Sequence, residues 1–170
     1  MKTRRIPIVF LLILLASTTW GELPVTKLTP QKKAQLNEDL TEVWPYIQTI
    51  KVEYDLVMAQ LETIETDSMK QKFLEKYEDY IEDAYFNKLI WLNIRQGRLL
   101  LLLIDRELGK TPYELLIQFR NKERADFWQK FAKVLDADLK GKYVPMYHPE
   151  MEEIILRLST EQKDKYLLPK

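Results

Sequence analysis

The amino-acid sequence predicts an all-α fold: a long kinked antiparallel helical hairpin packed on a leucine-rich central helix and several short helices. Apolar residues recur at helical spacing through most of the chain, and helix-start signals precede most of these segments. The most apolar run, at 99–104, has no second strand-like run to pair with. The hydrophobic fraction of 46% indicates a folded chain, and the charged fraction of 31% supplies a soluble surface.

Residues 1–21 are predicted to be a cleaved secretory signal peptide. A basic head precedes the apolar run 6–16, and small residues follow, with Thr19 and Gly21 placed like the −3 and −1 positions of a cleavage site. The apolar run is shorter than the roughly 20 residues that a membrane-spanning helix needs. We therefore expect a protein exported to the periplasm or secreted, without a stable membrane span after cleavage. A retained anchor is the alternative.

Composition excludes several classes of partner and site. The chain has 26 basic and 26 acidic residues, and three of the basic ones lie in the predicted signal, so the mature part is slightly acidic. Electrostatic attraction to nucleic acid is therefore not expected. Because the chain has no cysteine, disulfides, thiolate metal sites and a lipid-modified N-terminal cysteine are excluded.

A single domain is predicted over residues 30–170, after an extended leader at 22–29. Thr29 followed by Pro30 is a typical helix start. Apolar positions then alternate at spacings of four and three, which indicates a long helix packed against a partner: Leu36, Leu40, Val43, Ile47, Ile50, Tyr54, Val57, Leu61 and Ile64. Because this pattern continues in phase across Pro45, we expect a kink there and no break.

A turn at 65–67 leads to the second helix of the hairpin. Ser68 with Gln71 resembles a capping box, and helical spacing of apolar residues continues to about Leu92. Two long helices joined by so short a turn run antiparallel.

The central helix is predicted to begin after Asn93, which forms a capping box with Gln96. Its run 99–104 is dominated by leucine and has few β-branched residues, so we expect a helix buried on all sides. Gly109 is expected to end this helix as a C-cap.

Two shorter helices are predicted next. Thr111 and Glu114 form a capping box that opens a helix to about Arg120. The following amphipathic helix extends to about Leu139, and we expect its aromatic residues to lie in the core: Phe127, Trp128 and Phe131.

The chain is predicted to end with a loop and two helices. The loop spans residues 141–149 and carries aromatic residues and prolines. Pro149 opens a helix, and Ser159 with Gln162 is predicted to start a last short one.

The sequence contains no recognisable catalytic motif or metal-binding motif. His148 is the only histidine, and the mature chain's serines, Ser68 and Ser159, are predicted helix caps, so a serine–histidine hydrolase is not expected. Glu150, Glu152 and Glu153 lie near His148 but match no standard ligand spacing. We expect His148 to make a cap or loop contact, and we predict no metal and no cofactor.

Charged residues gather on one side of the central helix: Arg95, Arg98, Asp105 and Arg106. One interpretation is a structural ion-pair network at the edge of the core, since burial forces charges to pair. The other is a site for an anion or carboxylate, which arginine binds well. Arg98 and Asp105 lie roughly 10 Å apart along the helix axis, so they cannot pair directly.

Several blocks of the chain carry a resemblance. They are residues 94–98, 103–111, 113–115, 120 and 127–128, together with 44–46, 139–140 and 143. Between Gln31 and Tyr147 these blocks resemble an uncharacterised family of exported Bacteroidetes proteins, the domain-of-unknown-function family numbered forty-two ninety-four. That family has no assigned activity, cofactor or partner. Residues 121–124 depart from its pattern. The resemblance implies that seven residues belong to one constellation: Gln96, Gly97, Arg98, Asp105, Arg106, Thr111 and Tyr113.

We expect a non-enzymatic binding or scaffolding module of the periplasm or envelope, because no catalytic arrangement is evident and long helices suit recognition of a partner. The candidate binding residues are Gln96, Arg98, Asp105, Arg106, Thr111 and Tyr113. The expected partner is an envelope protein or an anionic ligand such as a carboxylate. The alternative is an envelope hydrolase of glycan or peptide that uses paired carboxylates among Asp105, Glu107 and Glu114.

Overall fold

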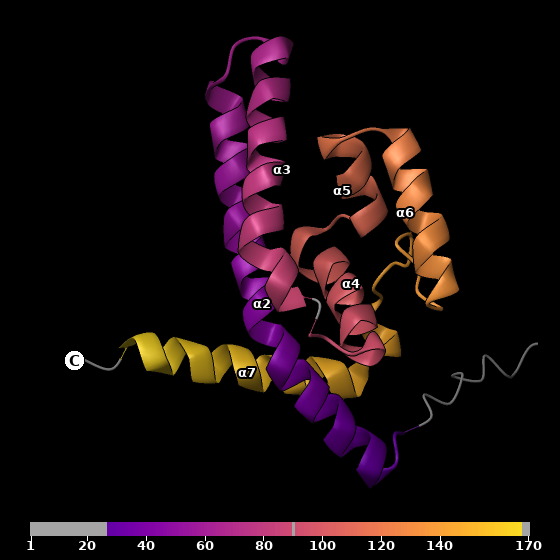
Figure 1. Ribbon diagram of the computed structural model, residues 1–170. Coiled ribbons are helices and arrows are strands. Elements are labelled where there is room, and N and C mark those ends of the chain that lie inside the picture. The colour runs from indigo at the N-terminus through magenta and orange to yellow at the C-terminus, as the bar shows by residue number, and fades with distance from the viewer. Residues whose placement is uncertain (1–26, 90, 168–170) are drawn as a thin grey trace, which may run out of the picture.

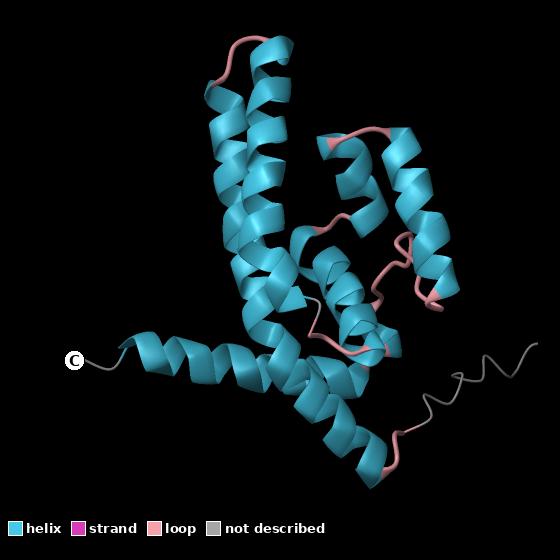
Figure 2. Cartoon of the chain, viewed as in Figure 1, coloured by secondary structure: helices cyan, strands magenta, loops and turns pink. Residues whose placement is uncertain are grey.

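The computed structural model describes residues 27–89 and 91–167, and helices form all of the regular secondary structure in this part (Figures 1 and 2). The all-α prediction is confirmed. No helix in the described ranges is long and apolar enough to cross a membrane. The predicted signal peptide, residues 1–21, lies outside the described residues. The helices are α2 (Pro30–Thr63), α3 (Asp67–Leu89), α4 (Ile94–Leu108), α5 (Pro112–Phe119), α6 (Lys122–Val134), the short 3-10 helix η1 (Pro145–Tyr147) and α7 (Pro149–Leu167).

Helix α2 is the longest element and contacts both α4 and α7 (Figure 1). It continues through Pro45, although proline leaves the carbonyl of Thr41 without its usual donor. In Figure 1 its C-terminal half lies beside α3, whereas α7 crosses its N-terminal half. Helices α5 and α6 form a second pair, which stands opposite the hairpin with α4 at its base.

The hydrophobic core lies where α2, α4 and α7 meet. Leu40, Ile47 and Leu103 are fully buried there, and Ile155 of α7 is almost so. The apolar residues in the first half of α2 therefore pack mainly against α4 and α7. The prediction that the run 99–104 is buried on all sides is wrong, because only Leu100 and Leu103 are buried and the flanking residues remain partly exposed.

An ion pair joins α2 to α4 beside this core. Arg95 donates from Nε to Oδ2 of Asp39 at 2.9 Å and from Nη2 to Oδ1 at 3.3 Å. Asp39 is buried, so its charge depends on this paired arrangement.

Several predicted helix ends are confirmed. Asn93 and Gln96 form a reciprocal capping box at the start of α4, and Thr111 and Glu114 form another at the start of α5. Gly109 ends α4 in the left-handed conformation, with φ of 65°.

Two predicted caps are wrong. Helix α3 begins at Asp67, and its first turn is capped by the Thr66 hydroxyl, which accepts from the backbone N–H of Met69 at 3.3 Å; Ser68 lies inside the helix. Ser159 starts no new helix, because α7 continues through it and its hydroxyl donates to the carbonyl of Ile155 at 2.8 Å. Serine is tolerated inside a helix when it makes this bond to the preceding turn.

Helix α6 differs from prediction in its length and in its surroundings. It ends at Val134, before the predicted Leu139, and Asp136 has a positive φ of 52°. Its aromatic residues are not in the core: the exposed fractions are 57% for Phe127, 42% for Trp128 and 51% for Phe131. Helical spacing predicted an apolar face correctly, but in the described residues no other element covers that face.

Candidate functional site

An open groove of about 750 Å³ lies between the α2–α3 hairpin and the α5–α6 pair. One face of α4 forms its floor, where lining residues alternate at spacings of three and four: Ile94, Gly97, Leu101, Ile104 and Leu108. This face is adjacent to the one that buries Leu100 and Leu103 in the core. The same helix therefore supports the core and carries the groove.

The two walls of the groove are almost entirely apolar. The hairpin contributes Tyr46, Ile50, Tyr54, Val57, Leu74 and Tyr77, and the α5–α6 pair contributes Leu115, Leu116, Phe119, Trp128, Phe131 and Leu135. The walls meet where the rings of Tyr54 and Phe119 pack edge to face, with centroids 6.1 Å apart. Such a surface offers few hydrogen bonds to a polar ligand.

Glu53, Arg98 and Arg120 are the charged residues that line the groove in the described part of the chain. Glu53 accepts a hydrogen bond from the hydroxyl of Tyr77 at 2.8 Å. Arg98 donates from Nη2 to the carbonyl of Leu135 at 2.9 Å and pairs with Asp136 at 3.0 Å. Burial lowers the pKa of Arg120, and the nearby Arg124 lowers it further.

Gly97 lies in the groove floor with open space in front of it. A Cβ atom added there would find no heavy atom within 4 Å, so no packing contact in the described structure requires glycine. Glycine inside a helix costs roughly 0.5–1 kcal/mol relative to alanine.

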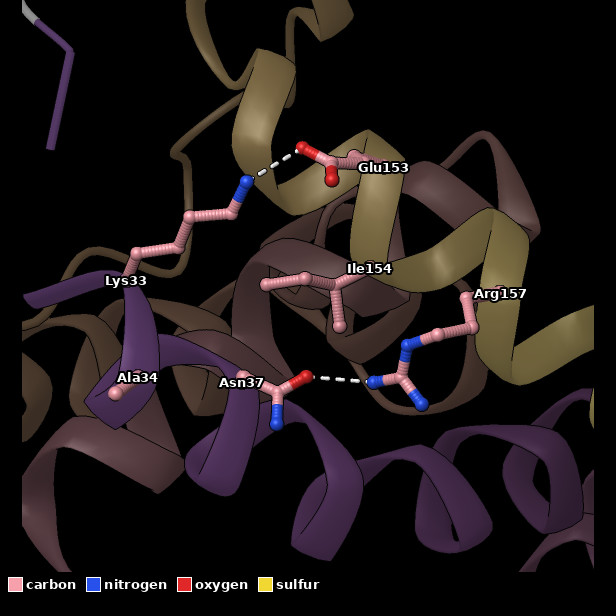
Figure 3. Close-up of a pocket in the computed structure, with 6 residues that line it drawn as sticks. All are labelled: Lys33, Ala34, Asn37, Glu153, Ile154 and Arg157. Atoms are coloured by element: carbon pink, nitrogen blue, oxygen red, sulfur yellow. Dashed lines mark hydrogen bonds and ion pairs between the residues drawn. The ribbon is translucent and has the colours of Figure 1, made fainter. Parts of the chain in front are cut away.

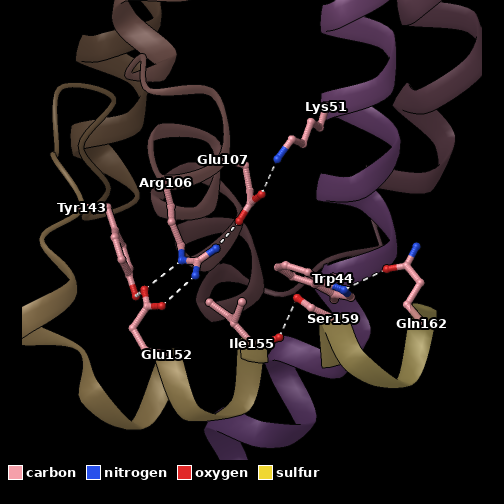
Figure 4. A network of polar contacts seen from close by, with 9 residues as sticks. All are labelled: Trp44, Lys51, Arg106, Glu107, Tyr143, Glu152, Ile155, Ser159 and Gln162. Carbon is pink, nitrogen blue, oxygen red and sulfur yellow. Dashed lines mark hydrogen bonds and ion pairs between the residues drawn. The ribbon is translucent and has the colours of Figure 1, made fainter. Parts of the chain in front are cut away.

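A polar network ties α4 to α7 and to α2 on another side of the molecule (Figure 4). Arg106 binds Glu152 of α7 and also pairs with Glu107, which accepts from Lys51 of α2 at 2.9 Å. The Tyr143 hydroxyl donates to Glu152 at 2.7 Å. The network thus connects two helices and a loop to the central helix.

The electrostatics of this network favour the ion-pair state. The hydrogen bond from Arg106 lowers the pKa of Glu152, and the same bond raises the pKa of Arg106. Burial, together with the bond to Glu152, raises the pKa of Tyr143. For Arg106 the structure therefore agrees with the structural ion-pair interpretation.

The six candidate binding residues do not form one cluster. Asp105 and Arg106 both contact Tyr143, since Asp105 accepts its backbone N–H at 2.7 Å and the Arg106 guanidinium lies 5.9 Å from its ring centre. Gln96 and Thr111 serve as capping residues. Tyr113 donates to Asp126 at 2.7 Å. Arg98 alone among the six lines the groove in the described structure.

The carboxylates considered for hydrolysis all accept hydrogen bonds within the domain. Asp105 binds the backbone of Tyr143, Glu107 binds Lys51 and Arg106, and Glu114 accepts the Thr111 N–H at 2.7 Å. None of the three lines the groove.

His148 and its neighbouring acids show no metal-binding arrangement. Its ring stacks on Tyr143 with centroids 5.0 Å apart, which confirms the predicted loop contact. Across the described residues, no group of three or more histidine, aspartate or glutamate side chains is placed to hold a metal ion.

A smaller polar notch of about 320 Å³ marks the crossing of α2 and α7 (Figure 3). Lys33 pairs with Glu153 at 2.7 Å, and Arg157 donates to the side chain of Asn37 at 2.5 Å. These exposed contacts link the two helices over the edge of the core.

The family described as "Domain of unknown function (DUF4294)" matches residues 23–157. The chain belongs to this family. The match confirms the resemblance seen in the sequence, and the DUF4294 region includes the whole groove and the α4–α7 network. No curated protein and no solved structure gives a significant match.

The groove itself was not predicted from the sequence. Two signals pointed to it: the run 99–104 is more apolar than one core-facing side of a helix requires, and Gly97 interrupts an otherwise strong helix.

Proposed function

We propose that this DUF4294 protein is a non-catalytic binding module of the periplasm or envelope that takes an elongated apolar ligand into the groove above α4. The observation that carries the proposal is the groove itself. Its volume of about 750 Å³ and its apolar, aromatic lining with few polar groups are typical of small-molecule sites.

The groove leaves apolar side chains in water that an occupant would cover. Trp128 and Phe131 retain exposed fractions of 42% and 51%, and Ile94 at the start of α4 retains 58%. Contiguous exposed apolar surface of this kind marks binding sites in soluble proteins. Covering it is favourable, because each square ångström removed from water contributes roughly 25 cal/mol.

The rest of the domain holds the floor of the groove in place. Leu100 and Leu103 fix α4 in the core, and the bonds of Arg95 and Arg106 fix it to α2 and α7. A binding surface carried by a helix that is packed and bonded in this way is pre-organised.

Binding is favoured over hydrolysis by the state of the acidic residues. Asp105 accepts a backbone N–H, Glu107 is in an ion pair and Glu114 is in a helix cap, and none of the three lines the groove in the described structure. Export is supported by the basic, apolar and small-residue order of residues 1–21.

The test is a titration of the exported protein with Nile Red, an uncharged dye whose emission rises in apolar surroundings. Gly97→Leu places a side chain in the open space of the floor, whereas Ala59→Leu adds a similar side chain to an exposed site on α2 outside the groove. We expect wild type and Ala59→Leu to bind the dye and Gly97→Leu to bind it at least about tenfold more weakly. Absence of binding, or equal binding by Gly97→Leu, would contradict the proposal.

A further inference from the structure

We infer that the ligand of the groove is an anionic amphiphile, with a single acyl chain along the α4 floor and a carboxylate or phosphate head at Arg98. This inference rests on the proposed function and specifies the chemistry of the ligand. It follows from the charge of the groove, the environment of Arg98 and the direction of the floor.

The charged residues that line the groove favour a ligand with an anionic head group. Of the charged residues that line the groove in the described chain, two are arginines and one is Glu53. Glu53 accepts hydroxyl groups from Tyr77 at 2.8 Å and from Tyr80 at 3.5 Å, so its charge is already solvated by its own wall. The three charged residues that line the groove in the described chain therefore sum to one positive charge, and Asp136, which does not line the groove, pairs with Arg98 at 3.0 Å.

Arg98 is placed to receive the head. Its side chain is 40% exposed, and its acidic partner, Asp136, is 92% exposed. An ion pair so open to solvent contributes little to stability, so a ligand anion can replace Asp136 at small cost. The guanidinium can donate two parallel hydrogen bonds to a carboxylate or phosphate, which gives such an anion a defined position.

The longer part of the groove floor extends from Arg98 toward the C-terminal end of α4, whereas Ile94 and Gly97 line its shorter part on the other side of Arg98. Between Arg98 and Leu108 the α4 axis rises by about 15 Å, and Leu101 and Ile104 line this stretch. No charged residue of α4 lines the groove along it in the described structure. Gly97, which directly precedes Arg98, has open space in front of it on the floor of the groove.

The experiment measures binding of three probes with the same fourteen-carbon chain, by isothermal titration calorimetry on the exported protein. Tetradecanoate and tetradecyl phosphate carry the two anionic heads, and tetradecanol is the uncharged control. The variants are Arg98→Gln, Arg98→Lys and Lys130→Gln, the last removing an exposed cation of α6 that does not line the groove. Circular dichroism verifies that each variant is folded.

We expect at least one anionic probe to bind about tenfold or more tightly than tetradecanol. Arg98→Gln should remove that advantage and leave tetradecanol binding unchanged, Arg98→Lys should retain part of it, and Lys130→Gln should behave as wild type. A preference between the two anions identifies the head as carboxylate or phosphate.

The inference is overturned if tetradecanol binds as tightly as both anions, or if Arg98→Gln leaves anion binding unchanged. It is also overturned if Lys130→Gln loses as much affinity as Arg98→Gln. Tetradecanol binding that Gly97→Leu abolishes would then still support the groove as an apolar binding site. If none of the three probes binds, both the inference and the proposed function fail.

Discussion

Arg106 of α4 and Glu152 of α7 are joined by two parallel hydrogen bonds, from Nε to Oε1 at 2.8 Å and from Nη2 to Oε2 at 2.7 Å. Tyr143 donates to the same carboxylate, so three donors meet on Glu152 (Figure 4). The pair fastens α7 to the helix that forms the groove floor. Its protonation state therefore affects the stability of the site.

The free energy of unfolding is expected to decrease as the pH is lowered below the ordinary pKa of a carboxyl group. The Arg106 guanidinium holds the pKa of Glu152 below its ordinary value of 4.5, and Lys133 holds that of Asp138 at about 2. Because both folded pKa values are depressed, the stabilisation is present above the unfolded pKa and is lost as pH falls through the folded one. Urea unfolding at a series of pH values measures this loss.

Glu152→Gln is the matched variant for that series. It should lower the free energy of unfolding at neutral pH by about 1–3 kcal/mol, because Arg106 and Tyr143 lose an ionised partner. It should also reduce the dependence of stability on acid pH. An unchanged acid dependence in the variant would show that Glu152 does not contribute to it.

Substitution of two glycines by alanine should have opposite effects. Gly97→Ala should raise the free energy of unfolding by roughly 0.5–1 kcal/mol, because the site is helical and has open space. Gly109→Ala should lower it by about 1 kcal/mol, since the φ of 65° is unfavourable for alanine. Denaturant titration of both variants provides the comparison, and destabilisation by Gly97→Ala would reveal a close contact at the floor.

Replacement of an exposed aromatic residue should be far milder than truncation of the core. Phe127→Ser should change the free energy of unfolding by no more than about 0.5 kcal/mol, because the ring is 57% exposed. Leu103→Ala should cost about 2–5 kcal/mol, because that side chain is fully buried. A large loss in Phe127→Ser would place that ring under a covering element after all.

Export predicts a shortened chain. The intact mass of the protein from its native host should correspond to a mature form that begins at Glu22, after cleavage following Gly21. Mass spectrometry of the purified protein measures this directly. A mass equal to that of the full chain would show a retained N-terminal segment.

The helix ends that the sequence predicted well are those determined by a few neighbouring residues. Asn93 with Gln96, Thr111 with Glu114, and the left-handed Gly109 all act within one turn of the helix that they begin or end. Their geometry needs no information from distant parts of the chain.

The misplaced cap at Ser68 is a local error, because Thr66 offers an equivalent hydroxyl two residues earlier, but the other errors concern features that depend on tertiary contacts. A serine such as Ser159 either starts a helix or bonds back within one, and a contact with α2, the bond from Trp44 Nε1 to Gln162 at 3.2 Å, favours the continuous helix. The apolar face of α6 is evident from Phe127 and Phe131, but periodicity does not tell whether another helix covers it. The groove was missed for the same reason, since its walls come from helices far apart in sequence.

The helices of the domain do not contribute equally to its buried core, and this affects which of them unfold first. In the described residues, the buried cluster takes its members from α2, α4, α7 and Tyr143 and none from α5 or α6. We therefore expect helices α5 and α6 to unfold locally while the cluster stays intact. One wall of the groove belongs to this pair and the other to the α2–α3 hairpin. An occupant that contacts both walls would couple their unfolding, and amide protons of α5 and α6 would then exchange as slowly as those of the core.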